Sequence, residues 1–417
     1  MSMSSSEKNL QDFEWAFGLN RLALRLMAIW PGDDDCIEES KNKQLRVPCM
    51  ILAMLFFLFL PQMAALILVV HELPLVIDNL MTSTSVLTST IKLYNLWDGR
   101  KVLQPVVRSV TRDWLRDKHE WERGQMRREA AKARLFTVTG YFILAGCYMG
   151  FALAPLLGIQ VRLITNITDH GQRYHLVQSY YPSFDYSESP YYELVLISQY
   201  TAGIFVGMAV SIPDVYMVAL VNHMTAQFGV LGTHVETSMW ESDGQSIPEC
   251  SRRRDFRAKL RFFVDRHVHL MKNVAAIEDS FSFVVAPQIL CMVVMVCCLS
   301  FQILSVRSDT SDHKPPILQV LTLVMTLFTM MMHMLVNCFA CEVLNERSTE
   351  MFHKIYGSGW YTVHQHKARD LIPLMAMSGI PQKITAAKIF RLSLRTYCNI
   401  LKSAVGYISM LIAVSGK

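Results

Sequence analysis

Histidine pairs are the residues whose spacing comes closest to a metal site in this sequence. His267 and His269 are separated by one residue, as are His364 and His366. Imidazole nitrogens at such spacing can bind Zn²⁺ when further ligands lie nearby. Each pair lies in a charged segment, where histidines are more often solvated than coordinating. We therefore expect solvated side chains and no metal ion at either pair.

A second candidate for chemistry is the CxxC pair formed by Cys338 and Cys341. No other CxxC pair stands at metal-site spacing, and most of the ten cysteines lie inside apolar stretches, where cysteine behaves as a small hydrophobic residue. The HExxH, GxSxG, P-loop and GxGxxG motifs are absent from the sequence. The sequence therefore predicts no enzyme, no metal site and no cofactor.

Ionisable residues inside the apolar stretches form a third group. Asp78, Asp214 and Lys402 are the notable ones. Charged groups at membrane depth face protein or water and not lipid. Three scattered groups do not make a proton relay, so the sequence argues against a pump or a transporter.

Long apolar segments provide the elements that must position these residues. Hydrophobic residues make up 52% of the 417 residues, and charged residues only 18%, against about 25% in globular proteins. At about 1.5 Å per residue, seven segments are long enough to cross a hydrocarbon core of about 30 Å. The sequence thus predicts an all-α, seven-span membrane protein with a single membrane domain over residues 1–417. The expected spans are 48–70, 73–93, 133–157, 192–219, 281–303, 317–338 and 392–414.

Lys and Arg residues are distributed unevenly between the connections. The N-terminal segment (1–47) and every second connection after it (94–132, 220–280 and 339–391) together carry 31 Lys and Arg residues. The segments between them carry five. The positive-inside rule then predicts a cytoplasmic N-terminus and an extracellular C-terminus. A sequon places a candidate glycosylation site, Asn166, on the outside. This orientation is opposite to that of G-protein-coupled receptors, so we exclude that class.

Motifs along nearly the whole chain resemble those of insect odorant receptors. Residues 12–31 are similar to the family's N-terminal segment, and residues 189–194 to its entry into the fourth span. The tract from Cys341 to Tyr361, followed by residues 388–397, carries the most specific likeness. In the last span, Ser403-Ala404 stand where the related gustatory receptors have Gln-Phe. The connection between the fourth and fifth spans is shorter than in the family's coreceptor, which favours a ligand-tuning subunit.

The resemblance implies a subunit of a tetrameric, odorant-gated, non-selective cation channel formed with the coreceptor in the plasma membrane of olfactory sensory neurons, at the dendrite. Such a channel passes monovalent and divalent cations and binds no nucleic acid. Its helices extend into a cytoplasmic anchor region, and residues 339–391 form the assembly region. Contacts between subunits are expected from Trp360, Tyr361, Leu371, Ile372 and Leu374. The resemblance also makes the last span the pore lining, with candidate pore and gate residues Lys402, Met410, Ala413 and Val414.

The expected ligand is a small, volatile, mostly apolar molecule held in the outer half of the helical bundle. Such a pocket needs apolar and aromatic walls with a few polar anchors. Candidate residues come from the second, third, fourth and sixth spans: Asn79, Met81, Ser83, Tyr148, Phe151, Gln199, Gly203, Leu323, Leu327 and Phe328. The alternative that the sequence leaves open is a metabotropic or gustatory-type chemoreceptor.

Overall fold

Helices form almost all of the structure, a computed structural model that describes residues 4–31, 41–156, 165, 175–182, 188–238, 249–307, 317–357, 360–362 and 365–415. Besides the long helices there are three helices of 9 to 14 residues, a π-helix, a 3-10 turn and a pair of short strands. The elements in order are α1 (Ser5–Leu26), α2 (Lys41–Met54), the π-helix η1 (Leu55–Phe59), α3 (Leu60–Leu68), α4 (Leu73–Leu115), α5 (Glu120–Leu156), α6 (Tyr191–Ser238), α7 (Glu249–Arg307), α8 (Ile317–Gly357), η2 (Trp360–Thr362), α9 (Gln365–Ser378), β1 (Thr385–Ala386), β2 (Phe390–Arg391) and α10 (Leu394–Ser415).

Helices α4 to α8 are much longer than a membrane span. They contain between 37 and 59 residues, which corresponds to about 55 to 90 Å at 1.5 Å per residue. A hydrocarbon core needs only about 20 residues. Each of these helices is therefore longer than a single span requires, and their extension into the cytoplasm stays a prediction.

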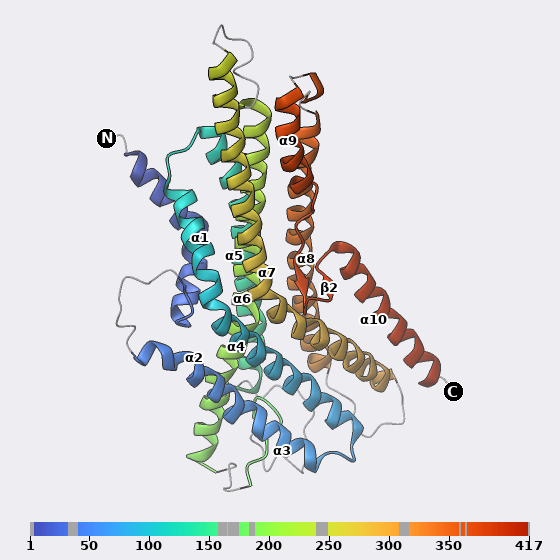
Figure 1. The fold of residues 1–417 in the computed structure, drawn as a ribbon. Helices are drawn as coiled ribbons and strands as arrows, with labels where there is room; N and C mark the ends of the chain where they lie inside the picture. Colours follow the sequence, from blue (N-terminus) through green and yellow to red (C-terminus); the bar gives the residue numbers. More distant parts are fainter. Residues whose placement is uncertain are drawn as a thin grey trace.

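Helix α6 forms the centre of the bundle. It packs against α5, α8, α4 and α7, and every residue from Ser211 to Gly232 is buried. A helix that is apolar nearly all round is stable only when other helices surround it. In Figure 1 the long helices run side by side through the upper part of the molecule, whereas α2, α3 and α10 lie toward the other end.

Five helical segments are long and apolar enough to cross a membrane, within the part of the chain that the structure describes: Leu45–Leu68, Glu120–Leu153, Tyr191–Thr237, Arg253–Gln302 and Val324–Gly357. They overlap five of the expected spans, and the chain is a multi-pass membrane protein. The second expected span lies in α4 and the seventh in α10. The count of seven and the orientation stay predictions.

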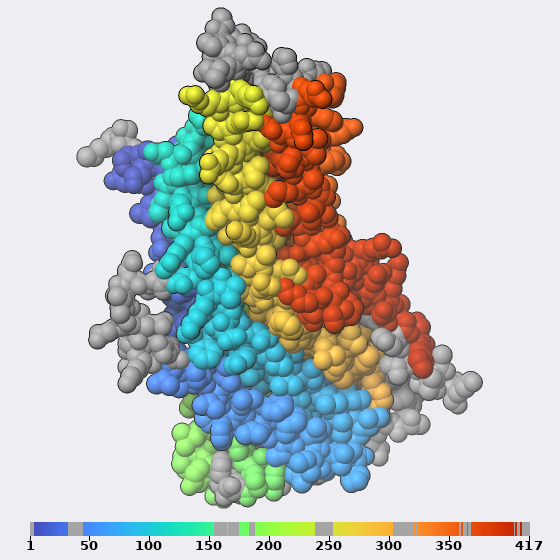
Figure 2. Space-filling model, viewed as in Figure 1, coloured from blue at the N-terminus to red at the C-terminus, as the bar shows by residue number. Residues whose placement is uncertain are grey.

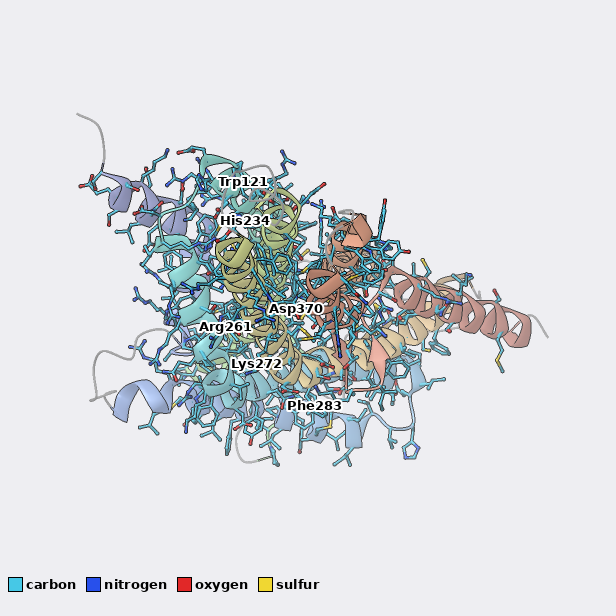
Figure 3. The ribbon with its side chains drawn as sticks, turned by 45° about the horizontal axis from the view of Figure 1, so that its top comes forward. Trp121, His234, Arg261, Lys272, Phe283 and Asp370 are labelled. Carbon is cyan, nitrogen blue, oxygen red and sulfur yellow. The ribbon has the colours of Figure 1, made fainter. Side chains whose placement is uncertain are left out.

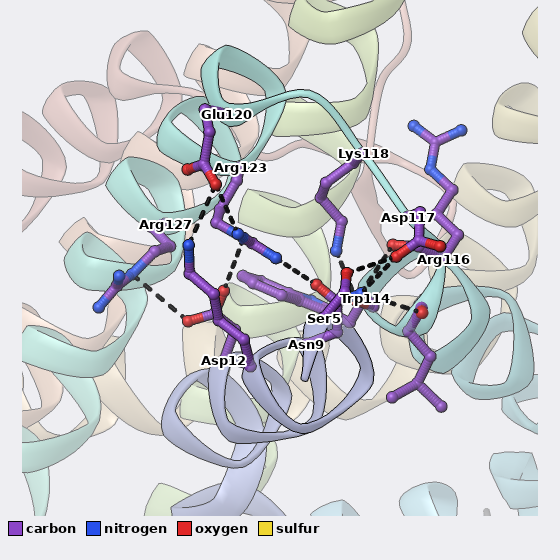
Figure 4. Close-up of polar contacts among 12 residues, drawn as sticks. Ser5, Asn9, Asp12, Trp114, Arg116, Asp117, Lys118, Glu120, Arg123 and Arg127 are labelled. Carbon is purple, nitrogen blue, oxygen red and sulfur yellow. Dashed lines mark hydrogen bonds and ion pairs between the residues drawn. The ribbon is translucent and has the colours of Figure 1, made fainter. Parts of the chain in front are cut away.

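Helix α1 is fastened to the ends of α4 and α5 by polar contacts (Figure 4). Ser4 and Glu7 form a capping box at its start, which satisfies two free backbone amides. Asp12 lies 3.1 Å from the Nε atom of Arg123 in α5, and Arg123 also donates to Asn9. All three side chains are buried, so the pairing fixes where α1 lies.

A small antiparallel strand pair precedes α10, which an all-α fold did not predict. Thr385 pairs with Arg391, and Ala386 with Phe390. The loop between the strands contacts α7, because the backbone amide of Ala387 donates to the carbonyl of Ser282 at 2.9 Å and that of Lys388 donates to its hydroxyl at 2.9 Å. The strand pair therefore attaches the start of α10 to the middle of α7.

Candidate ligand site and a buried polar cluster

Two buried amides of the predicted ligand set hold an extended segment, residues 175–182, against α4 and α6. Asn79 in α4 donates to the carbonyl of Gln62 at 2.9 Å and to the side chain of Gln178 at 3.1 Å. Gln199 in α6 donates to Ser179 and accepts from the backbone amide of Leu176, both at 3.1 Å. The segment therefore closes the bundle at this end, and both amides face the interior.

Tyr148 and Gly203 form the contact between α5 and α6. A Cβ atom at Gly203 would lie 3.2 Å from the ring of Tyr148, closer than ordinary packing permits. The Tyr148 hydroxyl donates to the carbonyl of Tyr200 at 2.6 Å, and the Tyr200 hydroxyl donates to the carbonyl of Ala152 at 2.7 Å. Glycine at 203 is thus what allows the tyrosine ring to approach α6 this closely. Phe151 is half-buried on the same side.

Sulfur-containing side chains surround Met81. It packs in a cluster with Cys291, Met295, Cys298 and Met330, and the half-buried Leu327 contacts that cluster. Methionine is flexible and polarizable, so such a wall adapts to ligands of different shape. Ser83 is buried, and its hydroxyl donates at 3.4 Å to the carbonyl one turn before it. Phe328 is half exposed on α8, and the side chain of Leu323 lies outside the described residues.

The predicted ligand residues therefore divide into three contact groups within the described chain: the two amides, the Tyr148–Gly203 pair, and the Met81 cluster with Leu327. The predicted pore residues and the predicted glycosylation site lie in other parts of the chain. Lys402 and Met410 are exposed on α10. The side chains of Ala413 and Val414 lie outside the described residues, and so does Asn166.

A buried ion pair at the centre of the bundle was not predicted. The Nζ atom of Lys92 in α4 lies 2.8 Å from Oδ1 of Asp214 in α6, and the two side chains are 0% and 3% exposed. Lys92 also donates to the carbonyl of Val210 at 2.9 Å and to Gln288 of α7 at 2.8 Å. Nδ1 of His333 in α8 lies 3.2 Å from the other oxygen of Asp214. The cluster joins α4, α6, α7 and α8. The sequence led us to expect Asp214 to be isolated, and it is not.

The sequence does contain an indication of this cluster, namely two further ionisable residues inside expected spans. Lys92 lies inside the expected second span, and His333 inside the sixth. An ionisable residue at membrane depth is a candidate functional residue together with its partner. What the sequence could not provide is the pairing itself, because Lys92 and Asp214 are 122 positions apart.

Comparisons with known proteins decide the family. The model of the odorant receptor family, described as "7tm Odorant receptor", matches residues 72–405. The chain belongs to the odorant receptor family. Comparison with curated protein sequences gives no match.

Solved structures with the same fold include the insect olfactory receptor OR5 from Machilis hrabei in complex with eugenol. It has a TM-score of 0.78 and 17% sequence identity, and the match covers 97% of this chain and 99% of that one. A second structure of the same receptor also has a TM-score of 0.78, with 16% identity. Members of this family are receptors and not enzymes, in agreement with the absence of enzyme motifs.

At the end of the bundle that carries α1, this odorant receptor holds a second polar network. Asp113 in α4 accepts from Arg266 at 2.7 Å and lies 3.3 Å from His223. Burial alone would raise the pKa of Asp113, but the hydrogen bond and charge of His223, together with the charge of Arg266, outweigh it and lower the pKa to about 2. The ionised carboxylate therefore stabilises the junction of α4, α6 and α7.

An aromatic contact lies in the same region. The rings of Trp121 and His234, both labelled in Figure 3, lie 4.9 Å apart.

One expectation for this region was wrong. His267 is not solvated but buried, with its ring edge-on to Phe228 at 5.8 Å. His269 accepts or donates a hydrogen bond at 2.8 Å to Ser109 of α4. Neighbouring helices cover this face of α7, which the charged sequence did not predict. No cluster of metal-binding side chains occurs among the described residues, and His364 and the side chain of His366 lie outside them.

The expected subunit contact is also corrected in part. Leu371 and Leu374 are fully buried within the chain's own core, so they are not available to another subunit. Tyr361 and Ile372 are exposed, at 73% and 55%, and Trp360 is half-buried. The amphipathic helix α9 thus uses one face for its own fold and leaves the other free.

Proposed function

We propose that this odorant receptor is a subunit of an odorant-gated cation channel whose pore is lined by α10. The observation that carries the proposal is the pattern of side chains on this helix. At 100° per residue, Asn399, Ser403, Gly406 and Met410 share one face, and all four are exposed. Small and polar residues along one stripe suit a water-filled path that ends in an apolar constriction at its outer end.

The other face of α10 supports the same arrangement. Tyr397, Ile400 and Leu401 pack against the core of the chain, so the helix is held from behind at its inner end. Figures 1 and 3 place the rest of α10 away from the bundle, and Figure 2 shows it at the edge of the molecule. Val405 and Met410 are 60% and 66% exposed. A helix that exposes this much apolar surface needs neighbouring subunits or lipid to cover it.

Assembly with the odorant coreceptor, as a tetramer in the plasma membrane, would bring four such helices around one axis. We take this chain as a ligand-tuning subunit, with its N-terminus in the cytoplasm and its C-terminus outside. The polar and small stripe would then face the axis, and Met410, Ala413 and Val414 would form the gate near the outer surface. Lys402 would lie in the wide inner vestibule, where its charge stays hydrated.

The ligand would bind in the outer half of the bundle, among the three contact groups described above. The Machilis receptor whose structure contains eugenol supports a small aromatic or aliphatic volatile as the ligand. Binding opens the pore only if the open state binds the ligand more tightly than the closed state. The strand pair that ties the start of α10 to Ser282 of α7 provides a route by which helix movements reach the pore.

Recording from excised patches tests this proposal against a metabotropic receptor. The chain is expressed with the coreceptor, and a panel of volatiles is applied with no nucleotide in the bath. A channel subunit gives ligand-evoked cation current that persists after excision. Current that disappears on excision and returns only with G-protein signalling would instead establish the metabotropic alternative.

A further inference from the structure

A cavity of about 240 Å³ lies between α5, α6 and α8, and none of the three predicted ligand groups lines it. Its α6 wall includes Asp214, which is 11 positions beyond Gly203 and therefore about 16 Å further along the helix. The cavity lies beside the Lys92–Asp214 pair and not beside the segment 175–182. It is thus a separate feature at a different depth in the bundle.

The cavity has apolar walls and a polar base. Leu135, Phe136 and Ile143 of α5 and Val215 of α6 form the walls. The base comes from α8, where His333 and Asn337 lie one turn apart on the same face. An apolar chamber with a few converging polar groups is the usual form of a small-molecule site.

Asn337 is the strongest sign that something binds here. Its side chain is fully buried, yet neither the amide nitrogen nor the amide oxygen has a hydrogen-bond partner among the described residues. A buried polar group left without a partner is costly, so native structures rarely leave one unexplained. An occupant of the cavity that both donates and accepts a hydrogen bond would satisfy both atoms.

His333 defines the chemistry of that occupant. The carboxylate of Asp214 only accepts hydrogen bonds when it is paired with Lys92, so Nδ1 of His333 carries the hydrogen that faces it. In the neutral ring the other nitrogen, Nε2, is an acceptor, and it has no partner among the residues described. The site therefore offers two acceptors and one donor to an uncharged group.

We propose that this cavity binds a neutral alcohol or phenol, whose hydroxyl donates to His333 or Asn337 and accepts from the Asn337 amide. A cavity of about 150 Å³ in another protein binds benzene, which has six non-hydrogen atoms. In proportion to its volume, this cavity admits roughly ten. Leu135 at the cavity wall is 65% exposed, and Phe142 on the same helix is 81% exposed. The ligand thus enters from the side of α5 that faces lipid and not through the outer segment.

Photolabelling with 3-azioctanol, a diazirine alcohol, tests the site directly. The full-length chain, in complex with the coreceptor in lipid nanodiscs, is labelled and its peptides are mapped by mass spectrometry. We expect adducts on residues 135–143 or 329–337 that fall at least fivefold with excess 1-octanol. Adducts confined to other regions, or adducts that octanol does not displace, would overturn the proposal.

Gly140 allows a matched pair of variants. A Cβ atom there would lie 3.6 Å from Val215 and 3.7 Å from Nε2 of His333, so a larger side chain enters the cavity without a clash at its first atom, whereas a Cβ at Gly146 on the same helix meets nothing within 4 Å. Gly140→Leu should abolish the labelling and Gly146→Leu should leave it unchanged. Equal labelling of both variants would show that the probe reacts from the lipid side and not within a site.

Asn337→Leu keeps the test valid if Gly140→Leu fails to fold. This change keeps a similar volume and breaks no hydrogen bond, because the Asn337 amide has no partner among the described residues, so the protein should be at least as stable without ligand. Labelling should fall about fivefold, because a hydroxyl loses both of its amide partners. A diazirine alkane of the same length should label weakly in the unaltered protein. Unchanged labelling of Asn337→Leu, or equal labelling by the alkane, would leave water or lipid as the occupant and refute the proposal.

Discussion

Removing the ammonium group of Lys92 should strongly destabilise the membrane bundle. Lys92→Met leaves the Asp214 carboxylate buried with only His333 beside it and takes a donor from Val210 and Gln288. Breaking a fully buried pair by removing one partner costs about 3 to 5 kcal/mol, whereas replacing both partners by apolar groups is often close to neutral. Lys92→Met combined with Asp214→Leu should therefore be more stable than Lys92→Met alone.

The assay is a double-mutant cycle on the purified protein, with unfolding followed by tryptophan fluorescence. We expect a coupling energy of at least about 2 kcal/mol between the two positions. Lys101 on the same helix is exposed, so Lys101→Met is a control that should change the stability by less than about 0.5 kcal/mol. Additive effects of the two single substitutions, with a coupling below about 0.5 kcal/mol, would refute the buried pair.

Three further predictions concern other parts of the chain. Arg123→Met should release α1 and raise its amide hydrogen exchange, whereas the exposed Arg128→Met should not. Because the folded pKa of Asp113 is about 2 and its ordinary value is 3.8, its stabilisation of about 2 kcal/mol is present above about pH 4 and disappears toward pH 2. Asp113→Asn should show that loss in unfolding experiments at pH 7 but not at pH 2. Gly203→Leu should displace Tyr148 and raise the half-maximal odorant concentration about tenfold or more in dose–response recordings, at unchanged surface expression.

The long helices were the part of the fold most readily predicted from the sequence. Apolar segments of about 20 residues must be helical in a membrane, because their backbone groups have no other hydrogen-bond partner there. The family resemblance then led us to expect helices that extend past the spans, and α4 and α7 contain 43 and 59 residues. The strand pair before α10 escaped prediction, since two-residue strands leave almost no periodic pattern.

Positions of polar side chains were harder to predict, for a physical reason. Whether Lys92 meets Asp214, or His267 becomes buried, depends on the rotation and relative height of helices that are distant in sequence. Composition and local spacing carry no information on either quantity. For α9, the sequence predicted a contact between subunits, but not that Leu371 and Leu374 contact the chain's own core.

The most direct test of the channel proposal is single-channel recording from the purified complex of this chain with the coreceptor in a planar bilayer. Met410 lies on the exposed small and polar face of α10. If this face lines the pore, Met410→Lys should lower the amplitude of odorant-evoked cation currents, because a fixed positive charge repels cations at a narrow point. Met410→Leu should leave the amplitude unchanged. Odorant-evoked openings of the same amplitude in Met410→Lys would contradict the claim that α10 of this receptor lines the pore.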